Sequence, residues 1–95
     1  MTMALHDVTD VEVLGPYRLR LTFSDGLTGD VDLSYIRDWA GVFAPLHNPE
    51  VFAQVRVDPE IGTITWPNGA DLAPEVLHER ASAHPVPKAH RLAAG

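Results

Sequence analysis

Five histidines are the side chains in this sequence best suited to hold a metal ion or transfer a proton. No two of them have the i, i+4 spacing that places two imidazoles on one helical face, and the chain has no cysteine to complete a zinc site. We therefore expect scattered surface histidines, no metal site and no cofactor. The five are His6, His47, His78, His84 and His90.

The chain contains no recognisable motif for nucleophilic catalysis. Cysteine is absent, and no serine lies in a G-x-S-x-G elbow. Asp25, Asp30 and Asp32 lack the residue order of a calcium-binding loop, and alternate acids on a strand do not surround a cation. We expect a protein that is not an enzyme and has no catalytic residues.

Arg18 and Arg20 could together clamp an anion, because alternate residues of a strand point to the same face. The acids on the neighbouring segments offer another interpretation, in which each arginine lies between two carboxylates in cross-strand ion pairs. We favour the ion pairs and keep both arginines as candidate binding residues.

The segment from Trp66 to Asp71 is a candidate recognition surface. Its structural interpretation is that Trp66 packs a hairpin, Pro67 ends a strand and Gly69 supplies the positive φ of a turn that Asn68 begins. We favour this interpretation and keep partner recognition open. Trp39 has the same two alternatives, a lid on the core or an exposed binding residue. The candidate binding residues are Trp39, Trp66, Asn68, Asp71, Arg18 and Arg20.

The strands that would position these residues follow a period-two pattern from Asp10 to Leu33, with apolar residues on odd positions. The pattern predicts a three-stranded antiparallel meander. A loop at 24–26 places Leu19 opposite Val31 on the buried face and pairs the two arginines with acids on the other. The predicted pairs there are Arg18 with Asp32, Arg20 with Asp30, Thr22 with Thr28 and Phe23 with Leu27. A loop at 14–16 predicts Val13 opposite Tyr17, Val11 opposite Leu19, Glu12 beside Arg18 and Asp10 beside Arg20.

Short helices and a second hairpin follow the meander. We predict a helix from Ser34, as N-cap, to Trp39, a helical twist at 41–46, and a helix capped by Asn48. A hairpin around the loop 59–62 should place Val55 and Val57 opposite Trp66 and Ile64. A last helix over 74–81 should bury Val76, Leu77 and Ala81. The fold class is α+β, with two or three short helices covering one face of the sheet.

Length and charge define one acidic domain. Residues 1–81 are enough for a single α+β core, and residues 82–95 are expected to form a disordered or weakly ordered tail. Thirteen acids and five arginines give residues 1–81 a formal charge of −8, while Lys88 and Arg91 follow. An acidic surface repels phosphate backbones, so we expect no direct binding to nucleic acid. Without a signal peptide or an apolar span, we expect a cytoplasmic protein that does not contact a membrane.

Residues 55–77 carry a resemblance, centred on the sequence WPNGADL at 66–72 with Pro74 and Leu77 after it. FSDG at 23–26 and GVFAPL at 41–46 extend it. Over about residues 7–81 the chain resembles the bacterial family called domain of unknown function 2442. The resemblance implies a small α+β protein. Some family members carry a helix-turn-helix extension, which suggests regulatory or antitoxin-like roles, and only fourteen residues follow Ala81 here. Members also tend to be encoded beside a second small protein, as toxins and antitoxins are.

These observations lead to two hypotheses about function. The first is a non-enzymatic protein-interaction module that binds a basic protein or a second copy of itself, as the antitoxin-like half of a two-component pair. The alternative is an accessory protein that binds a small molecule between the helices and the sheet, in a pocket lined by Trp39, Phe43 and Trp66.

Overall fold

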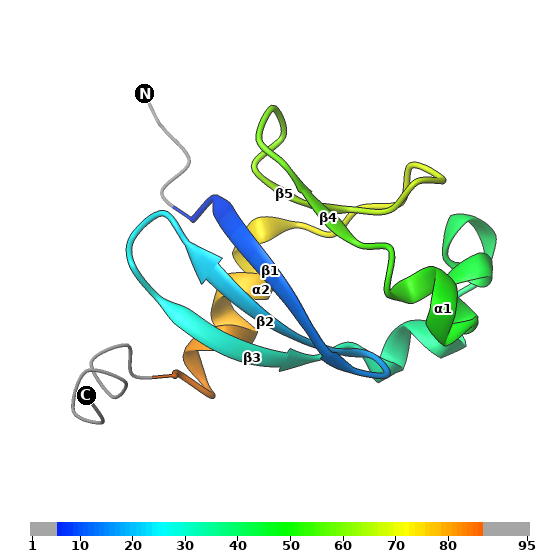
Figure 1. Ribbon diagram of the computed structural model, residues 1–95, viewed down its shortest axis with the longest axis horizontal. Helices are drawn as coiled ribbons and strands as arrows, with labels where there is room; N and C mark the ends of the chain where they lie inside the picture. Colours follow the sequence, from blue (N-terminus) through cyan, green and yellow to red (C-terminus); the bar gives the residue numbers. More distant parts are fainter. Residues whose placement is uncertain (1–5, 87–95) are drawn as a thin grey trace.

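A computed structural model describes residues 6–86 as a three-stranded sheet, a separate hairpin and short helices (Figure 1). The sheet contains β1 (Val8–Gly15), β2 (Arg18–Phe23) and β3 (Thr28–Asp32), and the hairpin contains β4 (Arg56–Asp58) and β5 (Thr63–Thr65). The helices are two 3₁₀ turns, η1 (Ser34–Asp38) and η2 (Gly41–His47), followed by α1 (Pro49–Phe52) and α2 (Pro74–Ser82). The predicted α+β class, with a meander and a second hairpin, is confirmed. No helix among residues 6–86 is long and apolar enough to cross a membrane.

The β2–β3 hairpin has the predicted register. Leu19 pairs with Val31, and the two arginines pair with Asp30 and Asp32. Three-residue loops of this kind favour glycine at the last position, and Gly26 has a φ of 93°. The Phe23 N–H donates to the carbonyl of Leu27 (2.8 Å), as the predicted pairing requires.

The predicted register of β1 with β2 is wrong by two residues. Val11 pairs with Leu21 and Val13 with Leu19, so the carboxylate of Glu12 lies beside Arg20 rather than Arg18. The register shifts at two places along β1, and the hairpin closes between Gly15 and Arg18. One of these irregularities separates Val13 from Gly15, so the period-two pattern does not continue through the turn. Val13, expected on the buried face, is 40% exposed.

Tyr17 makes this tight turn possible. Its φ is 63°, a left-handed conformation that non-glycine residues rarely adopt. Tertiary contacts hold it there: the ring is buried, the hydroxyl donates to the carbonyl of His47, and the Tyr17 carbonyl accepts from Leu33 (2.6 Å). The sequence pattern around Gly15 gave no indication that the tyrosine would take this position.

One hydrophobic core lies between the sheet and the elements that cover it. In Figure 1, α2 lies across one face of the sheet, and the β4–β5 hairpin lies next to β1. Gly29 of β3 lies so close to α2 that an added Cβ would fall 2.2 Å from the carbonyl oxygen of Ala81. The core includes residues of the meander, with Val8 from its first strand, and residues from η1, η2, α1, β5 and α2, while Val57 of β4 packs against it partly buried. Its largest fully buried side chains include Trp66, Phe23, Phe52, Leu19, Leu21, Leu33, Ile36, Leu46, Ile64 and Leu77.

The helices follow the prediction with two corrections. Asn48 caps α1 as expected, its side chain accepting from the Glu50 N–H (2.8 Å). Ser34 is not an N-cap, because the N-cap of η1 is Leu33 and the Ser34 N–H donates to Asp32 (2.8 Å). Val76 is 47% exposed rather than buried, because it lies about 100° around α2 from the buried Leu77.

The second hairpin has the predicted loop and places Val57 opposite Ile64. After α2, the chain continues along the outer edge of β3. The Asp30 N–H donates to His84 (3.1 Å), the Val86 N–H donates to Thr28 (2.7 Å), and Pro85 bridges Gly29. The first residues of the predicted tail therefore cover an edge of the sheet, and residues 87–95 lie outside the described residues.

Candidate interaction surface

An exposed apolar segment begins after η1 and continues through the first five residues of η2. Six of the seven residues from Trp39 to Pro45 are exposed, Phe43 is half-buried, and none carries a charge. Trp39 is 39% exposed and Val42 is 46% exposed. We call residues 39–45 the Trp39 corner. Uncharged apolar residues exposed together are typical of interaction sites, and tryptophan is enriched among the residues that dominate binding energy.

Neighbouring side chains pack against the Trp39 corner and form hydrogen bonds with its backbone. The Trp39 ring lies between Tyr35 (5.2 Å between ring centroids) and Phe43 (4.9 Å). His47 Nε2 lies 2.8 Å from the Trp39 carbonyl oxygen, and Asn68 Nδ2 donates to the Val42 carbonyl (2.7 Å). An ordered binding surface loses less conformational entropy when a partner binds.

The structure places the residues of the predicted recognition segment, 66–71, in different environments. Trp66 is 1% exposed, and its Nε1–H donates to the Phe52 carbonyl (2.8 Å) inside the core. Asn68 lies in the turn that Gly69 closes at a φ of 92°, and it contacts the Trp39 corner through Val42. Asp71 is exposed and forms an isolated backbone bridge with Thr65. Asn68 and Trp39 therefore belong to one surface, whereas Trp66 is a core residue.

Arg18 and Arg20 lie on the solvent-facing side of the sheet. Arg20 binds Asp30 with two hydrogen bonds (2.8 and 3.2 Å), and this contact lowers the pKa of Asp30 and raises the pKa of Arg20. Arg18 is opposite Asp32, at a shallow hollow of about 300 Å³ that His84 also lines. A hydrogen bond from the Ser34 N–H lowers the pKa of Asp32. Arg20 therefore lies between two acids, Glu12 and Asp30, as predicted. The prediction is wrong for Arg18, which has Asp32 on one side and Gly15 on the other.

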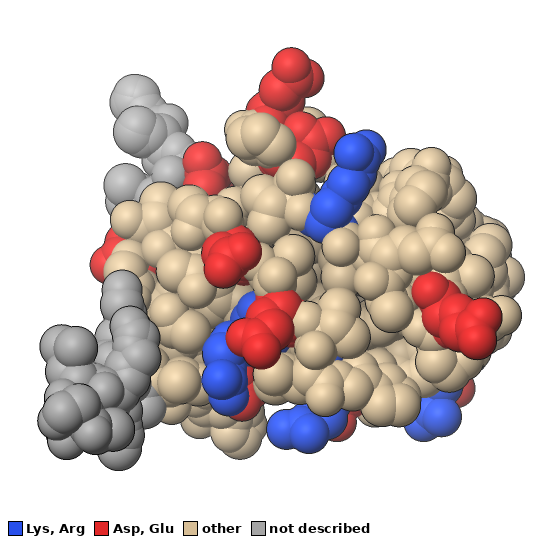
Figure 2. Space-filling model, in the orientation of Figure 1, with Lys and Arg blue, Asp and Glu red and all other residues tan. Residues whose placement is uncertain are grey.

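The charged side chains are dispersed. Figure 2 shows acidic side chains at the tip of the β4–β5 hairpin, across the sheet and over α1, with basic side chains between them. On this face the basic residues do not merge into a patch. Two of the other arginines stack on aromatic rings, Arg80 over Tyr35 and Arg37 over Tyr17.

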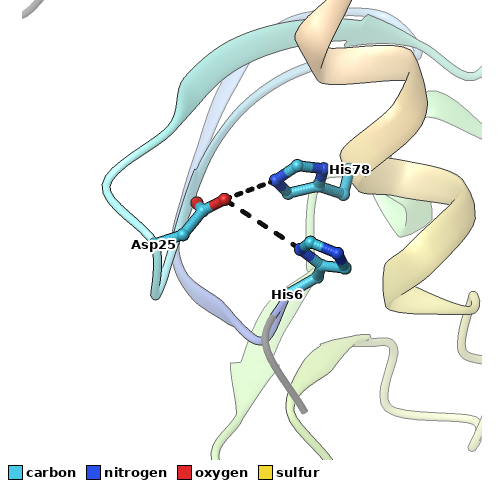
Figure 3. A group of neighbouring side chains, drawn as sticks. All are labelled: His6, Asp25 and His78. Carbon is cyan, nitrogen blue, oxygen red and sulfur yellow. Dashed lines mark hydrogen bonds and ion pairs between the residues drawn. The ribbon is translucent and has the colours of Figure 1, made fainter.

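One cluster has no counterpart in the sequence analysis. His6, Asp25 and His78 meet beside the β2–β3 turn, with potential ligand atoms all within 4.8 Å of one another (Figure 3). His78 Nε2 lies 2.8 Å from Asp25 Oδ2 although the two residues are 53 positions apart. The i, i+4 spacing rule could not find this cluster, because its members come from three separate segments: the residues before β1, the β2–β3 turn and α2. The other described histidines, His47 and His84, lie elsewhere.

Comparison with known proteins identifies the family of this chain. The model of the family described as "Protein of unknown function (DUF2442)" matches residues 8–83. Among solved structures, the crystal structure of "Putative DNA Binding Protein NE0471" from Nitrosomonas europaea ATCC 19718 is similar, with a TM-score of 0.69 and 32% sequence identity. The match covers 81% of this chain and 49% of that one, so this chain spans about half the length of that protein. A search of curated proteins gives no match. The resemblance at residues 23–26, 41–46 and 55–77 is thereby confirmed, and the chain belongs to the DUF2442 family.

Proposed function

We propose that this domain is a non-enzymatic protein-interaction module that binds a basic partner protein through the Trp39 corner. The observation that carries the proposal is the uncharged, exposed run at 39–45, held in place by Asn68 and His47. The ring of Trp39 supplies a large apolar contact with few rotatable bonds, which is characteristic of binding hot spots.

The negative net charge of the domain supports a basic partner protein. The described residues carry thirteen acids and five arginines, a formal charge of −8. A net field of this sign accelerates encounter with a positively charged protein and slows encounter with nucleic acid. Exposed charges contribute more to the rate and specificity of binding than to its final affinity.

DNA binding by this domain alone is disfavoured, although the similar Nitrosomonas protein is named as DNA binding. That protein is about twice as long as the matched region, so its other half can supply the contact with DNA. Three of the five arginines described here are already engaged, Arg20 with Asp30 and Arg37 and Arg80 with tyrosine rings. We expect no saturable change in fluorescence anisotropy when this chain is added to labelled duplex DNA at physiological salt. Saturable binding would show that this domain binds DNA without the other half of the longer protein.

The small-molecule alternative is less well supported. Trp66, one of its three proposed lining residues, is packed against Phe52 and is 1% exposed. Trp39 lies on the exposed corner instead. A thermal-shift screen would revive the alternative if a ligand stabilised the wild-type chain and failed to stabilise a variant with Phe43→Ala.

The main experiment is affinity purification from the native host with three tagged chains. The wild type should recover a protein of basic isoelectric point, in a quantity that falls as salt is raised. Trp39→Ser with Val42→Ser should lose that protein. Ile61→Ser is the matched control, because Ile61 is an apolar residue of similar exposure (48%) in the β4–β5 loop. The recovered protein is then purified and bound in vitro.

Two outcomes would overturn the proposal. In one, the corner variant recovers the same proteins as the wild type. In the other, sedimentation shows a homodimer that the corner variant dissociates, which would make a second copy the occupant of the surface.

An antitoxin-like role is the finer form of this proposal, and it depends on the identity of the partner. If the partner is the product of a neighbouring gene, expressing it alone should arrest growth and co-expression with this chain should restore growth. The Trp39→Ser, Val42→Ser chain should fail to restore growth. A partner that is harmless in both cases would leave the interaction module and exclude the antitoxin role.

A further inference from the structure

We propose that His6, Asp25 and His78 form a binding site for a divalent transition metal ion of the Zn²⁺ type. The two imidazoles face one carboxylate oxygen from the same side (Figure 3). His78 Nε2 is 2.8 Å and His6 Nδ1 is 4.0 Å from Asp25 Oδ2. This site is separate from the Trp39 corner and does not depend on the function proposed above.

The first line of support is a buried ring nitrogen that has no hydrogen bond. Nδ1 of His6 has almost no contact with solvent and no hydrogen-bond partner among the described residues. Buried polar atoms in proteins nearly always have a partner, so a lone one calls for an explanation. A metal ion beside Asp25 would supply that partner.

The second line of support is that hydrogen bonds and packing already orient the ligands. Asp25 Oδ1 accepts from the Leu27 N–H (3.0 Å), which leaves Oδ2 directed at the histidines. The His78 ring packs edge-on against Phe23 (4.9 Å between centroids) and against the His6 ring (3.9 Å). Such outer contacts fix ligand orientation in metal sites.

The backbone around His6 is tied to the same turn. The Ser24 N–H donates to the carbonyl of Asp7 (2.8 Å), and the Val8 N–H donates to Gly62 (2.9 Å). His6 is therefore anchored beside the turn that presents Asp25. An ion bound here would link the start of the described chain, the β2–β3 turn and α2.

The donor set selects the class of ion. Two imidazole nitrogens and one carboxylate suit Zn²⁺, Co²⁺ or Ni²⁺, whereas Ca²⁺ and Mg²⁺ prefer oxygen ligands.

Metal–ligand bonds of about 2.0–2.2 Å place tetrahedral ligands roughly 3.3–3.5 Å apart. The 2.8 Å contact would open slightly and the 4.0 Å contact would shorten, which side-chain rotation achieves. To bind the ion through Nε2, the neutral His78 imidazole would carry its proton on Nδ1. Three protein ligands leave one position for water or an anion.

The test uses the full chain, with any polyhistidine tag removed, titrated with Zn²⁺ by calorimetry. We expect one ion per chain and a rise in the thermal midpoint on adding Zn²⁺. Loss of an outer-shell contact typically weakens metal binding about 10–100-fold, so loss of a direct ligand should raise Kd at least tenfold. The variants are His6→Ala, Asp25→Asn and His78→Gln, and Asp25→Asn keeps an oxygen that can accept from Leu27.

Matched controls separate this site from adventitious histidine binding. His47→Ala and a His84→Ala, His90→Ala double variant should leave Kd and the thermal shift unchanged. Each variant is checked for wild-type circular dichroism without metal, and His6→Ala provides the test if His78→Gln does not fold. Absence of Zn²⁺ binding, unchanged Kd in the ligand variants, or loss of binding only in the control variants would overturn the proposal.

Discussion

The two tryptophans of this chain occupy opposite environments in regions that contact each other. Trp66 is 1% exposed, packs against Phe52 and has its indole N–H bound to a carbonyl. Trp39 is 39% exposed and lies in a cluster of tilted aromatic rings at the surface. Asn68, two residues after Trp66, connects the two regions through its bond to Val42. The WPNG motif therefore has two tasks: its tryptophan stabilises the core, and its asparagine positions the corner.

The largest predicted effect separates the stability roles of the two rings. Trp66→Ala should lower the free energy of unfolding by about 3–5 kcal/mol, because it leaves a cavity in the core. Trp39→Ala should change it by less than about 1 kcal/mol, as surface substitutions usually do. Urea denaturation followed by far-ultraviolet circular dichroism measures both. Equal losses would show that Trp39 is a core residue.

Close packing on the core side gives the next largest effect. Gly29→Ala would place a methyl group 2.2 Å from the Ala81 carbonyl oxygen, so α2 must move away from β3. We expect a loss of about 1–3 kcal/mol, as for other overpacked positions. Gly15→Ala is the control, because no atom lies within 4 Å of its added Cβ. Both are measured by urea denaturation, and no loss in Gly29→Ala would mean that α2 is loosely attached.

Substitutions of Asn68 test the connection between the Trp66 region and the Trp39 corner. Asn68→Ala removes the bond to Val42 and the one from the Ala70 N–H (3.2 Å), and should cost about 1 kcal/mol. Asn68→Asp keeps an acceptor for Ala70 and loses the donor to Val42. It should therefore speed amide hydrogen exchange in η2 while leaving the turn intact. Unchanged exchange in η2 would mean that the corner does not depend on Asn68.

The smallest predicted effect concerns the charged face of the sheet. Arg20 lowers the pKa of Asp30, so this ion pair stabilises the fold above the unfolded pKa of the carboxyl. The contribution is complete at pH 7 and is lost as the pH falls through the lowered pKa, below about pH 4. The gap in urea midpoint between wild type and Asp30→Asn should shrink from pH 7 to pH 3. A gap that widens on acidification would contradict a stabilising contribution from this pair. Because the pair is partly exposed, the gap should be small.

Local rules predicted the parts of the fold that depend on neighbouring residues. The Ser24–Gly26 loop has a glycine at its left-handed position, so the β2–β3 register followed from loop length. The Asn48 cap followed in the same way. The β1–β2 register could not be predicted, because Tyr17 takes a left-handed conformation that depends on His47 and Leu33, far along the chain.

The candidate sites show the same limit. The sequence indicated Trp39 and Asn68 as candidates and favoured a packing role for Trp66, but it left Trp39 open between a lid on the core and an exposed binding residue. His6, Asp25 and His78 lie far apart along the sequence, so no ligand spacing motif joins them. Their meeting depends on α2 lying across the sheet, which no spacing rule describes.

The most direct test of the interaction surface is the affinity of the purified partner for wild type and for Trp39→Ala, measured by calorimetry on chains of equal stability. Truncating a hot-spot tryptophan costs at least about 2 kcal/mol of binding energy. We therefore predict a Kd at least about tenfold higher for Trp39→Ala, with Ile61→Ala binding as the wild type does. An unchanged Kd for Trp39→Ala would contradict the account.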